Sequence, residues 1–355
     1  MLHVSLADLP APRCTFASDN SAGVHPDVLA ALADANDGHV LAYGNDVHTQ
    51  RVERAFGELF GRAVETFLVW GGSGGNVLAL SSLWRPGGGV VCTDSAHINV
   101  DETASPERVV GIKLLTSPHV DGKLLPEHLE SQVPYLGVQH HAQACAVSIT
   151  QATEYGTVYT ADEVAALCTT AHRLGMKVHL DGARIANATS ALGGSIEALR
   201  SFTVDAGVDV VTFGGTKNGM MYGEAVVYLD PELARYAIYA RKQVGQLPSK
   251  MRYVAAQFNS LLDSGRWLSL AGHANDMAGR LYAAIADLAA VRCAPPQANS
   301  LYPVLPRREA EQLQAWCPFY EWDHARSQYR WMTAWDTTAE DVDRFAAGVR
   351  LLLGS

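Results

Sequence analysis

The stretch KVHLDGARIAN, residues 177–187, decides the fold that the sequence predicts. Its first half alternates apolar and polar residues, which predicts a strand that ends at Asp181. Upstream of it, Thr160 and Glu163 form a capping-box pattern for a helix that Gly175 ends. A helix followed at once by a strand completes a crossover unit and favours a parallel sheet in an α/β fold.

Asp181 is the first candidate for chemistry, because doubly wound sheets bind their ligands at the carboxyl ends of strands. A carboxylate in that place suits a protonated ring nitrogen, which a pyridine cofactor needs in order to act as an electron sink. The alternative is an aspartate that caps the following helix.

A lone lysine, Lys217, stands in the uncharged, glycine-rich stretch TFGGTKNGM, residues 212–220, after an apolar run. No carboxylate is near it in this reading, and desolvation disfavours the ammonium form. A neutral amine is a nucleophile, so the stretch suggests Schiff-base chemistry. The alternative is an ordinary strand-to-turn sequence with a solvated lysine.

A glycine-rich turn, GGSGGN at residues 71–76, follows a predicted strand and precedes a predicted helix. The N-terminus of a helix offers free backbone N–H groups and the positive end of the helix dipole to a phosphate. The turn is neither the dinucleotide pattern nor a nucleoside-triphosphate loop. Close packing of helix on strand is the other explanation for these glycines.

The pair HLDGARI (179–185) and FGGTKNG (213–219) resembles the low-specificity L-threonine aldolases, pyridoxal-phosphate enzymes of fold type I in the beta-eliminating lyase group. The resemblance runs from about Phe16 to the C-terminus. It implies a mostly parallel sheet flanked by helices in a large domain, plus a smaller C-terminal α+β domain. It also implies pyridoxal 5'-phosphate as the cofactor. No metal ligand is predicted, because the six cysteines are widely scattered without a CxxC pair, which argues against a zinc site.

The same resemblance assigns roles to individual residues. The catalytic residues that it implies are Lys217, His97 and Asp181. The cofactor-binding residues that it implies are Gly72, Ser73, Gly74, Asn76, His97, Asp181, Arg184 and Lys217. The substrate-binding residues are Ser18, Arg184 and Arg330.

Several positions have alternatives. Ser18 also fits an ordinary turn. His97 would stack on the cofactor ring with support from Glu102, although a lone histidine is more often structural. Glu154 stands where one branch of the family has a histidine near the substrate hydroxyl, so its role stays open. Arg330, on the last predicted strand, would hold an α-carboxylate bidentately, whereas the alternative is an exposed arginine at a sheet edge.

The resemblance implies retro-aldol cleavage of L-threonine, L-allo-threonine and related β-hydroxy-α-amino acids to glycine and an aldehyde. The same cofactor frame also serves beta-elimination and transamination, which the fold alone does not separate. A non-catalytic, cofactor-binding regulator is the third alternative, although such a protein needs no electron sink. Fold-type-I sites are usually completed by a neighbouring subunit, so we expect a homo-oligomer, either a dimer or a tetramer.

Bulk properties agree with a large globular protein. The 355 residues are 48% apolar, and the net charge of -10 argues against nucleic acid as a partner. No stretch marks export or membrane insertion, so a cytoplasmic location is expected. We expect an N-terminal arm (1–25), a large cofactor-binding domain (26–246) and a small domain (247–355) whose last helix Thr337 and Glu340 cap.

Overall fold

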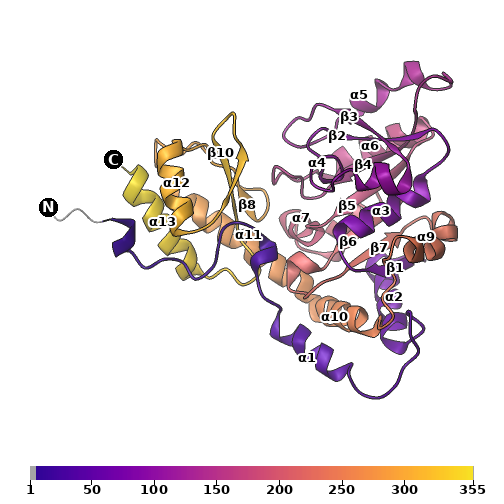
Figure 1. Cartoon of the computed structure of the whole chain (residues 1–355), viewed down its shortest axis with the longest axis horizontal. Helices are drawn as coiled ribbons and strands as arrows, with labels where there is room; N and C mark the ends of the chain where they lie inside the picture. Colours follow the sequence, from indigo (N-terminus) through magenta and orange to yellow (C-terminus); the bar gives the residue numbers. More distant parts are fainter. Residues whose placement is uncertain (1–4, 355) are drawn as a thin grey trace.

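The computed structural model describes residues 5–354, and its larger lobe is built on a seven-stranded sheet in the order β1-β7-β6-β5-β4-β2-β3 (Figure 1). The strands are β1 (Glu65–Val69), β2 (Gly88–Thr93), β3 (Lys113–Ser117), β4 (Gln143–Thr150), β5 (Lys177–Gly182), β6 (Val210–Gly214) and β7 (Glu224–Tyr228). Four pairs are parallel, and β7 runs antiparallel to both β6 and β1. The predicted mostly parallel sheet is confirmed.

Helices cover both faces of this sheet. They are α1 (Pro26–Asp34), α2 (Val47–Phe60), α3 (Gly72–Leu83), α4 (His97–Val100), α5 (Pro126–Glu130), α6 (Ala161–Arg173), α7 (Ile185–Ala191), α8 (Ile196–Ser201), α9 (Ala237–Gln243) and α10 (Arg252–Leu262). Helices α2, α6 and α10 bury Phe56, Leu167 and Phe258 on one face, and α3 buries Leu80 on the other. Parallel strands covered on both faces leave the strand ends as the place where ligands bind.

The smaller lobe carries an antiparallel sheet in the order β8-β10-β9. Its elements are β8 (Ser300–Leu301), β9 (Tyr320–Asp323), β10 (Gln328–Met332), α12 (Arg307–Trp316) and α13 (Ala339–Leu353). Helix α11 (Arg266–Ile285) joins the lobes, because Trp267 lies in the core of the larger lobe and Leu281 in that of the smaller. The predicted smaller α+β part is confirmed.

The N-terminal segment belongs to both lobes. Phe16 stacks on Phe345 of α13 with ring centroids 4.3 Å apart, and its carbonyl accepts the Met332 N–H at 2.9 Å. The chain then crosses to the larger lobe through the 3-10 turn η2 (Asp19–Ser21) and α1 (Figure 1). Helix α10 packs in the core of the larger lobe, although it follows the predicted domain boundary at residue 247. The boundary itself stays a prediction. Residues 1–4 of the predicted arm lie outside the described residues.

Two helix caps test the sequence analysis. The Thr160 hydroxyl accepts the Glu163 N–H and the Glu163 carboxylate accepts the Thr160 N–H, as predicted. The predicted cap of the last helix is wrong by one residue, because Thr338 caps α13 together with Asp341. Thr337 instead accepts an N–H of the turn that precedes the helix. None of the helices within residues 5–354 is long and apolar enough to cross a membrane.

Candidate active site

The carboxyl ends of β5 and β6 bring the two predicted catalytic motifs together. Asp181 of β5 pairs in parallel register with Thr212 of β6, and β6 leads into the turn η5 (Thr216–Asn218), which carries Lys217. Helix α3 packs directly on this pair, since a Cβ at Gly75 would lie 2.8 Å from a Thr212 methyl carbon. The strand ends and the N-terminus of α3 therefore form one site.

The glycine-rich stretch forms the first turn of α3, whereas the sequence analysis placed it in a turn ahead of the helix. The N–H groups of Gly72, Ser73 and Gly74 have no partner within the helix, because they lack a carbonyl four residues earlier. Gln246, which the sequence analysis missed, closes this end of the site: it accepts the Trp70 N–H at 3.0 Å, and its amide fills the space that a Gly74 Cβ would need. The turn is thus an N–H-lined cradle for an anion.

Asn76 is buried one turn into α3 and points towards Asp181. Its side-chain amide donates to Asp181 at 2.7 Å and to Glu102 at 2.8 Å. Glu102 in turn lies 2.8 Å from Nδ1 of His97. The amide of Asn76 therefore links two buried carboxylates and, through Glu102, the His97 ring.

The Asp181 carboxylate is held in its charged form. Burial alone would raise the pKa of Asp181, but the neighbouring His97 and His179 rings and the hydrogen bonds from Asn76 and the Ala183 N–H outweigh it and lower the pKa. The donor atoms of His97, Glu102 and Asp181 lie within 4.8 Å of one another. The Asn76 amide occupies one oxygen of each carboxylate.

His97 begins α4, and both its backbone and its ring are fixed. Its N–H donates to Glu154 at 2.9 Å, and Glu102 at its Nδ1 raises the pKa of the ring, although burial opposes this shift. The ring is 37% exposed, so Nε2 remains free to face a ligand. The second oxygen of Glu154 is buried and has no hydrogen-bond partner among the described residues.

Lys217 lies in a cluster of charges. Burial and the positive charge of Arg184 lower the pKa of its amine, while Asp19, Asp181 and Glu224 raise it. The interpretation that no carboxylate lies near this lysine is therefore wrong. Asp19 and Asp181 come from distant segments, and Glu224 lies across the hairpin between β6 and β7, which a search of the flanking sequence does not reveal.

Arg184 is committed to an ion pair with Asp19. Its guanidinium donates twice, at 2.6 and 2.9 Å, and Asn299 of the smaller lobe donates to the same carboxylate at 3.2 Å. Asp19 is almost fully buried, yet the Arg184 charge lowers the pKa of its carboxyl against the effect of burial. The pair joins the N-terminal segment to the strand ends of the larger lobe.

Arg330 of β10 reaches the same place from the smaller lobe. It donates to the Ala17 carbonyl at 3.0 Å, and its guanidinium carbon lies 4.6 Å from the Trp322 ring centroid. Its Nε is buried without a partner among the described residues. Burial and the Arg184 charge lower the pKa of Arg330, so the two guanidinium groups are close enough to repel each other. Asp19 neutralises only one of them, which leaves a place for an anion.

A sequence profile of the beta-eliminating lyase family matches residues 15–305. The chain belongs to the beta-eliminating lyase family. It is 40% identical over 344 residues to low specificity L-threonine aldolases of Pseudomonas sp. (strain NCIMB 10558) and of Pseudomonas aeruginosa, covering 96% of this chain and 98% of each relative.

Solved structures extend the comparison of this beta-eliminating lyase family member. A threonine aldolase of Leishmania major has a TM-score of 0.89 and 31% identity over 96% of this chain and 99% of that one. The serine palmitoyltransferase of Sphingomonas wittichii has a TM-score of 0.73 at 15% identity, over 96% of this chain and 87% of that one. The second likeness shows the fold alone, which is that of fold-type-I pyridoxal-phosphate enzymes.

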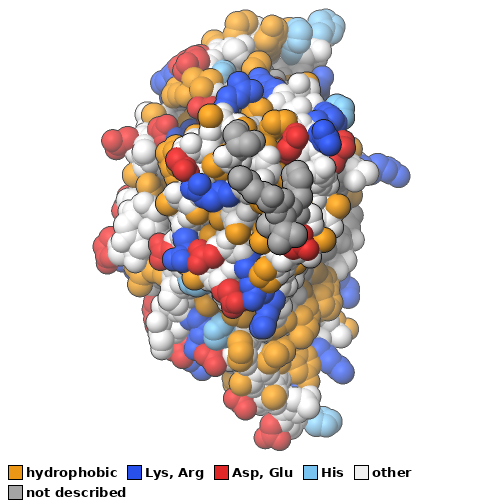
Figure 2. All heavy atoms as spheres, turned by 90° about the vertical axis from the view of Figure 1, so that its left-hand side faces the viewer, with side chains coloured by type: hydrophobic (Ala, Val, Ile, Leu, Met, Phe, Trp, Pro, Cys, Tyr) orange, Lys and Arg blue, Asp and Glu red, His pale blue; other side chains and the backbone are white. Residues whose placement is uncertain are grey.

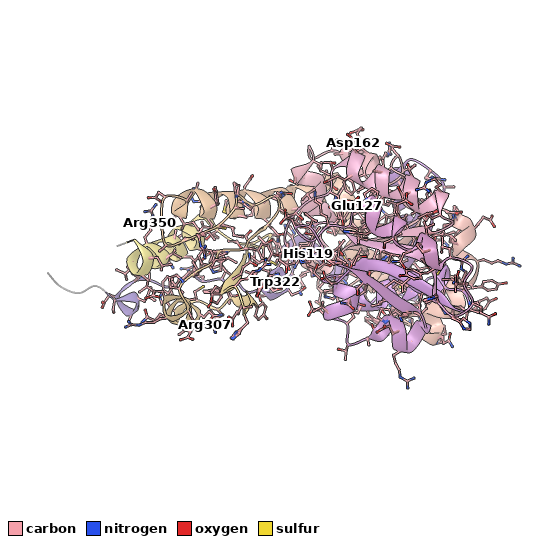
Figure 3. The ribbon with its side chains drawn as sticks, turned by 90° about the horizontal axis from the view of Figure 1, so that it is seen from above. His119, Glu127, Asp162, Arg307, Trp322 and Arg350 are labelled. Atoms are coloured by element: carbon pink, nitrogen blue, oxygen red, sulfur yellow. The ribbon has the colours of Figure 1, made fainter. Side chains whose placement is uncertain are left out.

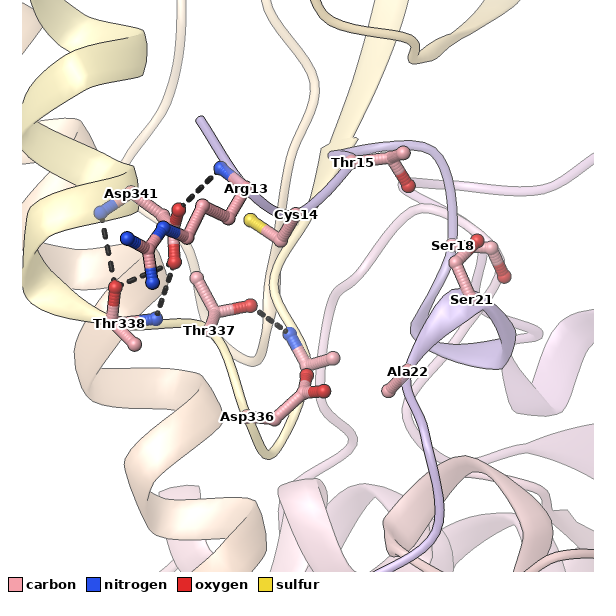
Figure 4. Close-up of a pocket in the computed structure, with 11 residues that line it drawn as sticks. Arg13, Cys14, Thr15, Ser18, Ser21, Ala22, Asp336, Thr337, Thr338 and Asp341 are labelled. Carbon is pink, nitrogen blue, oxygen red and sulfur yellow. Dashed lines mark hydrogen bonds between the residues drawn. The ribbon is translucent and has the colours of Figure 1, made fainter. Parts of the chain in front are cut away.

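In this family member Ser18 lies at the start of η2, next to Asp19, to which its hydroxyl donates at 3.5 Å. Its hydroxyl accepts the Asn20 N–H at 3.2 Å and so caps η2. Figure 4 shows Ser18 on the wall of a pocket of about 320 Å³ that Arg13 and Thr337 also line. The neighbouring Asp19, which the sequence analysis did not single out, points to Arg184 instead.

An aromatic cluster that the sequence analysis also missed lies at the junction of the lobes (Figure 3). The Trp322 ring packs on Tyr302 and Tyr155 with centroids 5.7 and 6.3 Å apart, and Tyr155 packs on His119 at 4.5 Å. Trp322, Tyr155 and His119 line an open pocket of about 450 Å³ next to α4. Trp322 therefore separates this pocket from the Arg330 guanidinium.

Proposed function

We propose that this chain is a pyridoxal-phosphate-dependent aldehyde-lyase that cleaves L-threonine, L-allo-threonine and related β-hydroxy-α-amino acids to glycine and an aldehyde. The observation that carries the proposal is the combination of a desolvated lysine, a buried aspartate at a strand end and two guanidinium groups with one counter-charge. The names of the relatives that are 40% identical over almost the full chain support the same activity.

The residues present fit pyridoxal phosphate. Gly72, Ser73 and Gly74 offer unpartnered N–H groups for the phosphate, and a side chain at Gly74 would collide with Gln246. Asp181 offers a carboxylate for the ring nitrogen, and Lys217 an amine for covalent attachment of the aldehyde. When bound, the cofactor supplies an electron sink for the negative charge left on the α-carbon as the bond to the hydroxyl-bearing carbon breaks.

The substrate carboxylate would be bound by Arg330, whose buried Nε lacks a partner among the described residues, with Arg184 beside it. Two donors on a planar guanidinium fix the orientation of a carboxylate as well as its position. Holding the carboxylate there decides which bond of the α-carbon is broken. Ser18 stays a possible further contact, although its hydroxyl caps η2 in this structure.

His97 would take the proton of the substrate hydroxyl, directly or through a water molecule. Its Nδ1 faces Glu102, so Nε2 is the nitrogen available for the proton. The hydrogen bond from the His97 N–H to Glu154 fixes the start of α4 and thus the position of the ring. Asp181, which Asn76 links to Glu102, would offer a charged carboxylate to the ring nitrogen.

The chain would act as a homo-oligomer. Several large apolar side chains of the larger lobe are exposed, among them Leu41 (72%), Val47 (66%) and Tyr239 (66%). Figure 2 shows hydrophobic side chains gathered near the lower end of the molecule, where Figure 1 places α1 and the loop after it. Exposed apolar area of this kind marks a contact with another chain. Light scattering would distinguish a dimer from a tetramer. A cytoplasmic location stays a prediction.

The test is a product assay. We expect the purified protein, loaded with pyridoxal phosphate, to release glycine and acetaldehyde in equal amounts from L-threonine or L-allo-threonine. Lys217→Ala should abolish both products while the protein remains folded, and Lys113→Ala, at an exposed position of β3, should change neither. A keto acid with ammonia would instead point to elimination, and full activity of Lys217→Ala would exclude the proposed role of that lysine.

A further inference from the structure

Glu224 is a buried carboxylate for which the proposed reaction has no use. It is the first residue of β7, paired with Val69 of β1 on one side and Gly214 of β6 on the other, and it is 6% exposed. A buried carboxylate is costly unless it is paired or hydrogen-bonded. Within residues 5–354 no ion pair reaches Glu224, so its place beside the Lys217 turn calls for an explanation.

The contacts of Glu224 fix the start of that turn. Its carboxylate accepts the Gly215 N–H at 2.6 Å. The Gly215 carbonyl accepts the N–H groups of Asn218 and Met220 at 3.0 and 3.3 Å, which places Lys217 inside a closed loop. Glu224 thus fixes the position of Gly215, whose carbonyl accepts both hydrogen bonds of the turn.

The second property of Glu224 is its charge. Burial raises the pKa of Glu224 to about 7, against the Gly215 N–H, the Thr216 hydroxyl and the Lys217 charge, which lower it. Asp181 adds to the increase. The charges that act on Lys217 in turn are those of Arg184, Asp19, Asp181 and Glu224. Of these, Glu224 is the one on β7, which pairs with the strand that leads into the Lys217 turn.

We propose that Glu224 is a positioning residue for Lys217, whose carboxylate anchors the turn and whose negative charge stabilises the protonated form of the Lys217 nitrogen. The proposal rests on the proposed function, because Lys217 is the residue that would carry the cofactor. A hydrogen-bond acceptor without charge would suffice to anchor the turn, so the charge is the part of the proposal that experiment has to test.

Glu224→Gln separates the two roles, because the amide keeps an acceptor for the Gly215 N–H but has no charge. The measurement is a pH titration of the visible absorbance of the bound pyridoxal phosphate, which follows protonation of the Lys217 nitrogen. Above about pH 7 the Glu224 carboxylate is negatively charged, and loss of that charge destabilises the protonated form. We therefore expect the midpoint to fall by roughly one pH unit. Glu65→Gln, at the exposed start of the neighbouring strand β1, should leave the midpoint unchanged.

Glu224→Asp keeps the charge and serves if the glutamine variant does not fold. We expect its midpoint to stay with that of the parent protein, and a shift in this variant contradicts the proposal. An unchanged midpoint in Glu224→Gln would reduce Glu224 to a structural anchor. Lys217→Ala distinguishes the two proposals. If this variant keeps the pH-dependent absorbance, the proposed role of Lys217 is wrong. If the variant loses that absorbance, the role of Lys217 holds and the Glu224 variants test only the proposal on Glu224.

Discussion

On the side of Asp181 and Lys217 the site is built from the ends of two neighbouring parallel strands, whereas on the side of Arg330 it is built from the smaller lobe and a segment near the N-terminus. The first side lies within a sheet covered on both faces, and its geometry follows from strand register. The second depends on how two lobes and a crossing segment meet. We call the Asp181 and Lys217 side the cofactor side and the Arg330 side the carboxylate side. Substitutions on the cofactor side should lower kcat. Substitutions on the carboxylate side should lower the free energy of unfolding or the affinity for the substrate.

The largest effect should come from Asp19, which joins the carboxylate side to the larger lobe. Asp19→Ala leaves the Arg184 guanidinium buried without its counter-charge, so we expect the free energy of unfolding to fall by about 3–5 kcal/mol. Asp27→Ala is the matched control, because it breaks an exposed pair with Arg266 and should cost at most about 1 kcal/mol. Denaturant unfolding of both variants gives the comparison.

The same pair has a defined pH dependence. Burial would raise the pKa of Asp19, but the Arg184 charge lowers it below its ordinary value of 3.8. A lowered pKa in the folded state means that the pair stabilises fully above the unfolded value and that this contribution is lost as the pH falls below it. The gap in stability between the parent and Asp19→Ala should therefore shrink below about pH 4. A constant gap would rule out the charge as its cause.

The next effect concerns the cofactor side. Asp181→Asn removes the charge proposed to face the ring nitrogen, and we expect kcat to fall about 100- to 1000-fold, as for other losses of charge stabilisation in a dry site. KM for the amino acid should change little, because the substrate carboxylate is expected to bind to the arginines and not to Asp181. Steady-state kinetics with L-threonine measure both constants, and unaltered kcat would contradict the assignment to the ring nitrogen.

A smaller effect is expected on the carboxylate side. Arg330→Ala removes the charged hydrogen bonds proposed to hold the substrate carboxylate, so kcat/KM should fall roughly 10- to 100-fold. The visible absorbance and the affinity of the bound cofactor should stay as in the parent, since Arg330 lies on β10. If Arg330→Ala lost the cofactor as well, the two sides would not be separable.

The smallest effect should come from Trp322, whose ring faces the Arg330 guanidinium carbon at 4.6 Å. Trp322→Leu should raise KM roughly two- to fivefold through loss of the cation–π contact. Tyr320→Leu serves as its control, because that ring lies farther away, at 5.5 Å, and is 53% exposed. Equal effects of the two substitutions would show that the stacking on Trp322 is not what holds Arg330.

The two sides also differ in how far they follow from the sequence. The ends of β5 and β6 are marked locally by an apolar run and a glycine turn, so the sequence predicts Asp181 and Lys217 at the strand ends. The pairing of Asp19 with Arg184 joins segments 165 residues apart, and no local pattern marks it. Only Ser18 was predicted from that segment. A short polar stretch does not tell which of its side chains turns inwards.

Glu224 lies between these cases. It is only seven residues after Lys217, yet the flanking sequence predicts an uncharged neighbourhood, because Glu224 comes beside the start of the Lys217 turn only when β7 pairs with β6 and places it opposite Gly214. Register turns a separation along the chain into a contact across the hairpin. A search for charged neighbours of a lysine in such a turn should therefore include the strand that pairs with the strand before the turn.

The short stretch from Ala17 to Asp19 holds both arginines at once, through the Ala17 carbonyl and the Asp19 carboxylate. Ser18 between them is extended, and two residues of extended chain span at most about 7 Å. If the lobes rotate to admit a substrate, this segment keeps the spacing of the two guanidinium groups constant. The distance between the two guanidinium groups is therefore set by the N-terminal segment, and this distance limits the size of an anion that both can contact.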